Sequence, residues 1–252
     1  MRIALLIAGQ ARFCEAFDVQ LASLKNYDSI DWFVTLWNTP GDSCKPIAMN
    51  WQNIDNNKVR VQIEKRLPPN HTLVHVDVRE QSSCPPYPYS MTPADDRFRM
   101  WQQYSILRWC DNARQDHEKL YGKYDMVIRS RPDIAIINDV DLAYWGNIIS
   151  QNPKNIILPY PDRGGPCMFN DQFALCSSDG MTDYTSAIDK WMEMHIMYNM
   201  EFTPETLIGA ILYKKGYSWP PTNFNSPALR LYYGHWKNGY GSVWIGNPGT
   251  WG

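Results

Sequence analysis

The stretch from Tyr124 to Ile137, YDMVIRSRPDIAII, decides the fold that we expect for the whole chain. Residues 125–128 predict a buried strand, because they are mostly apolar. The charged turn Arg129-Ser-Arg-Pro-Asp133 follows, and residues 134–137 return to an apolar run. A core strand that ends in two arginines and an aspartate indicates that something binds there, since buried charge without a partner is costly.

The three charged residues of this turn suit one kind of ligand. Arg129 and Arg131 are two residues apart on an extended segment, so their side chains point the same way, and Asp133 lies two residues further on. Open α/β sheets bind ligands at the carboxyl ends of their strands. The triple therefore predicts a ligand that carries phosphates, together with a divalent ion. The alternative is a structural Arg–Asp cluster that holds the turn.

The composition permits one large α/β domain and excludes wholesale disorder. The chain has 252 residues, of which 44% are hydrophobic and 20% are charged, so a substantial core is available. Aromatic residues make up 13%, which suits sugars and nucleobases but equally suits core packing. The formal net charge is -2 and no long basic run exists, so nucleic acid is not expected as the main partner.

The cysteines and the apolar segments predict a cytoplasmic protein. No C-x-x-C pair exists, which argues against a zinc site, and a disulfide framework is not typical of a domain this size. The apolar run at the start covers about seven residues, at the lower limit for a signal sequence, so a first strand explains it better. No later stretch is long enough for a transmembrane helix.

The first residues predict the opening of a Rossmann-like fold. Residues 2–8 form a continuous apolar run, typical of a strand covered on both faces. The turn Gly9-Gln-Ala-Arg12 and a helix over residues 13–25 follow, and residues 31–37 form the second strand. A helix between two strands makes them parallel. We therefore expect a central, mostly parallel sheet flanked by helices, with this turn at its ligand edge.

The end of the second strand adds two candidates beside the Gly9 turn. Trp37 could stack on a base, although a half-buried core tryptophan is the more common explanation of one such residue. Asn38 opens a strong turn signal, Asn-Thr-Pro-Gly. The remaining expected elements are strands over residues 59–63, 73–78 and 155–159, a loop over 81–93, a strand leading to Cys176, and helices over 94–120, 180–199 and 203–216.

The chain resembles the GT-A-type nucleotide-sugar glycosyltransferases, in particular a small bacterial and viral group whose central strand ends in R-x-R-x-D. The carrying segments are Gly9-Gln-Ala-Arg12, Tyr124 to Asp133, Asn170-Asp-Gln-Phe-Ala174 and Thr203-Pro-Glu205, in the expected order. The resemblance implies a donor site built from Gly9, Gln10, Arg12, Trp37, Asn38, Arg129, Arg131 and Asp133.

The family's metal motif is only half present. In GT-A enzymes a D-x-D motif holds a divalent ion and the donor diphosphate, whereas the matching position here reads Arg131-Pro-Asp133. The resemblance implies Mn²⁺ or Mg²⁺ at Asp133, and the two arginines could neutralise the diphosphate instead. His235 is a second candidate metal ligand, although a lone histidine beside Trp and Tyr is more often structural. The D-x-D of Asp139 and Asp141 follows the strand too late and ranks below Asp133.

The resemblance also implies catalytic carboxylates on the acceptor side. Asp171 is the candidate base that takes the proton of the acceptor hydroxyl, and Glu205 is the second choice. Each has a structural alternative: Asp171 could cap a turn, and Glu205 could interact with the dipole of its helix. Gly9, likewise, could serve only backbone geometry.

We therefore expect one domain, residues 1–252, with a nucleotide-sugar-binding half over 1–137 and an acceptor half over 138–252. The resemblance implies a transferase that moves a sugar from a nucleoside-diphosphate sugar to a glycan or glycolipid acceptor, in surface polysaccharide or lipopolysaccharide synthesis. A sugar nucleotidyltransferase is one alternative, although the turn after the first strand is too short for its Gly-rich signature. A non-catalytic carbohydrate-binding protein is the other.

Overall fold

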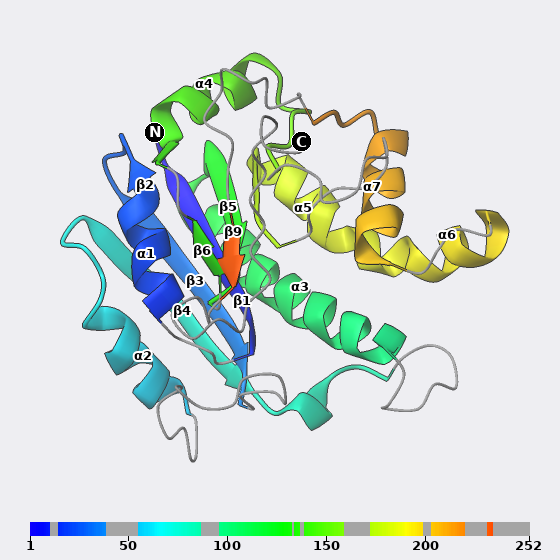
Figure 1. Ribbon diagram of the computed structural model, residues 1–252, viewed down its shortest axis with the longest axis horizontal. Helices are drawn as coiled ribbons and strands as arrows, with labels where there is room; N and C mark the ends of the chain where they lie inside the picture. Colours follow the sequence, from blue (N-terminus) through cyan, green and yellow to red (C-terminus); the bar gives the residue numbers. More distant parts are fainter. Residues whose placement is uncertain are drawn as a thin grey trace, which may run out of the picture.

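A five-stranded sheet lies at the centre of the computed structural model (Figure 1). The structure describes residues 1–10, 15–38, 55–86, 96–132, 134–136, 139–158, 172–198, 203–219 and 231–233. In spatial order the strands are β4 (His71–Arg79), β3 (Ile30–Trp37), β1 (Ile3–Gln10), β5 (Met126–Ser130) and β8 (Ala174–Cys176). The first four are mutually parallel, and β8 pairs with β5 in the antiparallel sense.

The order of the strands reverses direction at β1. From β1 the chain moves outward through β3 to β4, and then returns to place β5 on the other side of β1. Such a reversal is a topological switch point, where open α/β sheets leave a crevice at the carboxyl ends of the strands. The predicted fold class, α/β with a central and mostly parallel sheet, is therefore confirmed.

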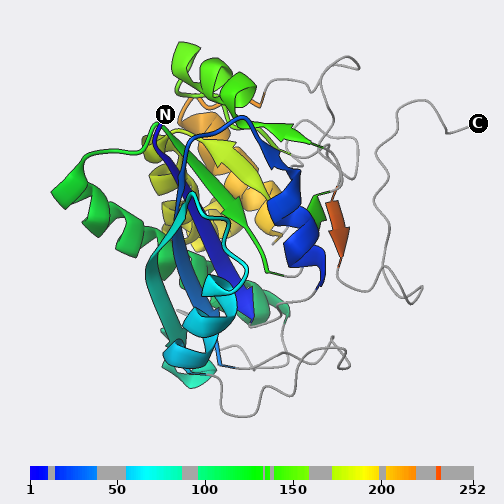
Figure 2. The same ribbon diagram turned by 90° about the vertical axis from the view of Figure 1, so that its left-hand side faces the viewer.

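Helices cover both faces of the sheet (Figure 2). One face is covered by α3 (Asp96–Tyr121), α5 (Ser178–Ser186), the 3-10 helix η2 (Ala187–Lys190), α6 (Trp191–Tyr198) and α7 (Pro204–Lys214). The other face is covered by α1 (Glu15–Ser23), α2 (Asn56–Glu64) and α4 (Leu142–Gln151). The remaining elements are the 3-10 helix η1 (Gln81–Ser83), the strand pair β2 (Leu24–Lys25) and β7 (Val140–Asp141), and the pair β6 (Ile134–Ile136) and β9 (Leu231–Tyr233).

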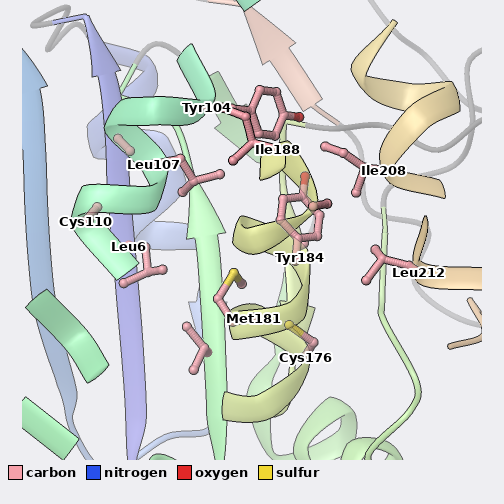
Figure 3. Close-up of a cluster of buried hydrophobic side chains, with 14 of the residues drawn as sticks. Leu6, Tyr104, Leu107, Cys110, Cys176, Met181, Tyr184, Ile188, Ile208 and Leu212 are labelled. Carbon is pink, nitrogen blue, oxygen red and sulfur yellow. The ribbon is translucent and has the colours of Figure 1, made fainter. Parts of the chain in front are cut away.

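Burial on both faces explains why the first strand is apolar throughout. Ala4, Leu6 and Ala8 of β1 face α3, and the alternate residues face α1 and α4. Figure 3 shows the core on the α3 side, where Leu6 lies beside Leu107 and Cys110 of α3. We name this side of the sheet the α3 face.

Three expectations about secondary structure need correction. Residues 59–63, expected as a strand, lie in α2, because Asp55 caps that helix by accepting from the backbone N–H of Lys58. Residues 155–159, expected as a strand, form only isolated bridges, Asn155 to Ser218 and Ile157 to Leu175. The single helix expected over 180–199 is divided into α5, η2 and α6.

The long helices are confirmed with their predicted ends. α3 runs from Asp96 to Tyr121 and stops before Gly122, whose φ of 86° favours glycine. α7 begins with the hydroxyl of Thr203, which accepts from the backbone N–H of Thr206, and Pro204 takes its first position. Within the described ranges, no helix combines the length and the apolar character that crossing a membrane requires.

Candidate functional site

The carboxyl ends of β1 and β5 lie side by side at the switch point. Gly9, at the end of β1, has a φ of 146°, which side chains rarely adopt. A Cβ atom at Gly9 would lie 3.8 Å from Cδ of Pro132, which is an ordinary contact. Glycine is therefore required by the backbone conformation, which supports the geometric explanation of Gly9. This geometry brings the Gln10 end of β1 beside the Arg129–Pro132 segment.

Arg129 is the most unusual residue at this end of the sheet. It lies on β5, between Leu6 of β1 and Ala174 of β8, and it shares the α3 face with them. Its exposed fraction is 1%, yet neither Nε nor Nη1 has a hydrogen-bond acceptor among the residues that the structure describes. The Arg–Asp cluster that was the alternative explanation depends on Asp133, which lies outside the described residues, so the contacts of the described residues alone favour a ligand site.

Burial of the Arg129 guanidinium has a large free-energy cost. Burial of a charged group is tolerated when the group is paired or changes its protonation state. Arginine does not lose its proton in proteins, so that second route is closed to Arg129. An anion that accepts hydrogen bonds from Nε and Nη1 would restore the lost solvation and satisfy both donors. The oxygens of a phosphate or a carboxylate can accept hydrogen bonds from such charged donors.

The residue next to Arg129 fixes the end of β5 from the opposite face. Ser130 is buried, and its hydroxyl accepts a hydrogen bond from the amide of Gln20 on α1. Gln20 is also buried, and its Oε1 has no hydrogen-bond partner in the described ranges. The hydrogen bond from Gln20 thus holds the end of β5 against α1, which restricts the position of Arg129.

Trp37 and Asn38 lie at the end of β3, as predicted, but with different accessibility. Trp37 is only 2% exposed and packs edge-to-face against Trp109 of α3, with ring centroids 5.6 Å apart. This burial supports the core explanation of Trp37. The backbone N–H of Asn38 donates to the carbonyl of Arg79 at 2.8 Å, which holds the turn after β3 to the end of β4.

A second group of side chains at the strand ends was not expected from the sequence. Arg79, the last residue of β4, lies over the ring of Trp109 at 4.1 Å from its centroid. Its Nε also donates to Oδ2 of Asp77 at 2.5 Å. The sequence signal was an arginine directly after the apolar strand, but its aromatic partner lies on α3, far along the chain. Among the described residues, Arg79, Trp109 and Asp77 thus form an aromatic-basic group at the carboxyl end of β4.

Several predicted site residues lie outside the described residues. These are Arg12, Asp133, Asp171 and His235, and their roles stay predictions. Arg131 is partly buried just beyond the end of β5. Glu205 lies in the first turn of α7, where its side chain is not described, and that helix packs mainly on α5, η2 and α6.

The acidic pair Asp139 and Asp141 has a structural role. Asp141 caps α4, because its side chain accepts from the backbone N–H of Tyr144, and it also accepts from Asn26 at 2.7 Å. Asp139 lies 3.9 Å from Lys25 in an exposed ion pair. Their low ranking as metal ligands agrees with these contacts. The described part of the chain holds no group of three or more His, Cys, Asp or Glu side chains suited to a metal ion.

A second buried arginine on the α3 face provides a contrast. Arg114 of α3 donates through Nε to Asp111 at 2.7 Å, and its Nη1 lies 2.7 Å from Glu118. It also donates to the hydroxyls of Ser178 and Thr182 on α5. Burial opposes its charge, but the carboxylates of Asp111 and Glu118 outweigh this effect, and the pKa of Arg114 lies above its ordinary value. This paired cluster joins α3 to α5.

Comparisons with known proteins give distant structural likenesses. No family model matches the chain, and no curated protein matches it. Among solved structures, mouse xyloside xylosyltransferase 1 in its apo form aligns over 86% of this chain and 82% of its own, with 10% identity and a TM-score of 0.48. The glycosyltransferase GlyE of Streptococcus pneumoniae TIGR4 aligns over 89% of this chain and 46% of its own, with 13% identity and a TM-score of 0.46.

Proposed function

We propose that this chain is a glycosyltransferase that takes a sugar from a nucleoside-diphosphate sugar, with the diphosphate bound at the switch point between β1 and β5. One observation carries the proposal: among the described residues, the buried guanidinium of Arg129 finds no acceptor for Nε or Nη1. A diphosphate supplies oxygens for both donors and a negative charge that compensates the buried cation. The aromatic-basic stack at Arg79, on the same side of the sheet, supports a nucleotide rather than a free phosphate.

In the proposed reaction the acceptor hydroxyl attacks the anomeric carbon of the donor sugar. The bond between that carbon and the diphosphate oxygen breaks, and the bonding electron pair leaves with the nucleoside diphosphate. Arg129 stabilises the negative charge that develops on the leaving oxygens, which is the step where a fixed cation lowers the barrier most. The hydroxyl proton passes to a carboxylate, for which Asp171 is the first candidate and Glu205 the second.

A divalent cation is a further component of the proposal. Asp133 follows Arg131 at the strand end and is the residue that would hold Mn²⁺ or Mg²⁺ beside the diphosphate, with His235 as a second candidate ligand. Such an ion would supply additional positive charge to the leaving group. We propose a glycan or glycolipid acceptor, in surface polysaccharide or lipopolysaccharide synthesis.

Ligand-induced stabilisation tests the proposal directly. The protein is heated with UDP-, GDP-, CMP- and dTDP-sugars and with inorganic pyrophosphate, each with and without Mn²⁺. The correct donor is expected to stabilise the fold by about 2.7 kcal/mol at a concentration 100 times its Kd. The difference in stabilisation with and without Mn²⁺ measures how much the metal ion contributes to donor binding.

Two arginine-to-methionine variants make this experiment specific. Arg129→Met is expected to abolish the stabilisation, whereas Arg60→Met, which changes an exposed arginine of α2 that lies 3.5 Å from Glu64, is expected to keep it. Absence of stabilisation by every donor and by pyrophosphate at saturating concentration would refute the proposal. Normal stabilisation of Arg129→Met would place the diphosphate elsewhere.

A further inference from the structure

We infer that Arg79 is the residue on which the base of the nucleotide stacks, an inference that rests on the proposed function. The sequence pointed to Trp37 for this role, but Trp37 is covered by Trp109 and is 2% exposed. Trp109 is in turn covered by the guanidinium of Arg79, at 4.1 Å from the ring centroid. Trp37 meets Trp109 edge-to-face, and only Arg79 lies over the face of the Trp109 ring, with a side chain that is 38% exposed.

The position of Arg79 places it in line with the switch point. The register pairs Arg79 of β4 with Trp37 of β3, and Trp37 with Gln10 of β1. Residues paired in this way lie in one row across the strands and on one face of the sheet. With about 4.8 Å between neighbouring strands, Arg79 and Gln10 are roughly 10 Å apart along this row. A nucleotide that lies along the strand ends would have its base at Arg79 and its phosphates toward the end of β1 and the Arg129 turn.

The chemistry of the stack favours a planar ligand. A guanidinium is flat, delocalised and weakly hydrated, so it stacks on aromatic rings with both of its faces. One face of Arg79 is occupied by Trp109, and Asp77 fixes the plane by accepting from Nε at 2.5 Å. A guanidinium held rigidly in this way loses little conformational entropy when a base is added to its other face.

This arrangement separates two parts of one ligand. Arg79 is three strands away from Arg129 in the order β4-β3-β1-β5, so it contributes to the nucleoside end and Arg129 to the diphosphate end. Inorganic pyrophosphate contains only the second part. Binding of pyrophosphate therefore depends on Arg129 and is independent of Arg79, whereas binding of a nucleoside diphosphate depends on both.

Calorimetric titration with UDP, GDP and inorganic pyrophosphate tests the inference. Arg79→Ala is expected to weaken binding of the nucleoside diphosphate about tenfold, the size of one base stacked on a planar side chain, and to leave pyrophosphate binding unchanged. Arg79→Lys keeps the positive charge and an ion-pair partner for Asp77 but lacks the planar group. It is expected to lose as much affinity as Arg79→Ala, and its melting temperature shows that the fold is intact.

Each other outcome overturns the inference in a recognisable way. Equal losses for pyrophosphate and for nucleoside diphosphate would assign Arg79 to the phosphates. Wild-type affinity of Arg79→Lys would show that charge and not stacking is used, and wild-type affinity of Arg79→Ala would remove the residue from the site. Failure of the unaltered protein to bind any of the three probes would instead refute the proposed function, and the inference with it.

Discussion

Arg114 and Arg129 are both buried arginines on the α3 face, and their surroundings are opposite. Arg114 contacts two carboxylates and two hydroxyls, which satisfy its donors within the chain. Nε and Nη1 of Arg129 have no acceptors within the described part of the chain. The difference teaches that burial of charge alone does not identify a ligand site. The distinguishing feature is whether the protein itself supplies the partners.

His71 is a third buried ionisable group, and it differs from both arginines because it can be neutral. His71, at the start of β4, is 9% exposed and accepts a hydrogen bond at Nδ1 from the indole N–H of Trp32. Its Nε2 therefore carries the proton and donates to the hydroxyl of Tyr27. Burial lowers the pKa of His71 from 6.5 to about 4, so this side chain is neutral at pH 7. Arg129 has no such route, because the guanidinium does not release its proton.

The largest expected effect comes from breaking the paired arginine. Arg114→Met leaves the carboxylates of Asp111 and Glu118 without their cation in a buried position. The free energy of unfolding is expected to fall by about 3–5 kcal/mol, the usual cost of removing one partner of a buried ion pair. Urea denaturation measures the change. A variant as stable as the original protein would show that the cluster does not hold α3 to α5.

Arg129→Met is expected to change the free energy of unfolding in the opposite direction from Arg114→Met. In Arg129→Met an apolar side chain replaces a buried charge that lacks acceptors, so the ligand-free protein should gain about 1–4 kcal/mol of stability. The same denaturation experiment, without nucleotides, measures the gain. A loss of stability comparable to that of Arg114→Met would show that Arg129 is a structural residue and would remove the contrast between the two arginines.

The smallest effect on stability is expected when the pH is lowered and His71 becomes protonated. A histidine whose pKa is lower in the folded protein stabilises the fold fully above its unfolded value of 6.5, and this contribution is lost as the pH falls toward 4. Protonation of Nδ1 also breaks the hydrogen bond from Trp32. The loss at pH 5 is expected to be about 1 kcal/mol after allowance for screening by solvent. Melting temperatures between pH 7 and pH 4.5 measure it, and His71→Gln should show a flatter profile. An equal slope in both proteins would assign the acid sensitivity to other groups.

The inner strands β1 and β3 were predictable because their burial is nearly uniform. β1 and β3 are covered on both faces, so nearly every residue is apolar and the run itself identifies them. The prediction of a strand over residues 59–63 of α2 was wrong for a related reason. Val59, Val61 and Ile63 alternate as in a strand, yet Val61 is 41% exposed, and only Val59 and Ile63, four residues apart, face the core. The cap at Asp55 was the signal that favoured a helix.

The candidate site was predictable only as far as its backbone position. The sequence places Gly9 and Arg129 at strand ends, because strand ends follow from the apolar runs. It does not reveal that Arg129 lacks acceptors among the described residues, since this depends on where their carboxylates lie in space. The same holds for Arg79, whose interaction with Trp109 joins a strand to a later helix through tertiary packing.

The pairing of β1 with β5 has a consequence for how the chain folds. Arg2, next to β1, bonds to Asp125, next to β5, and these residues are 123 positions apart in the sequence. β1 can pair with β3 early, but its second edge stays open until β5 has been synthesised, and contacts of such long sequence separation form slowly. An open edge of an apolar strand is prone to associate with other chains. The pairing of β1 with β5, which creates the candidate site, is thus also the pairing that we expect to form late. Variants that delay this pairing are expected to lower the yield of native protein before they alter its final stability.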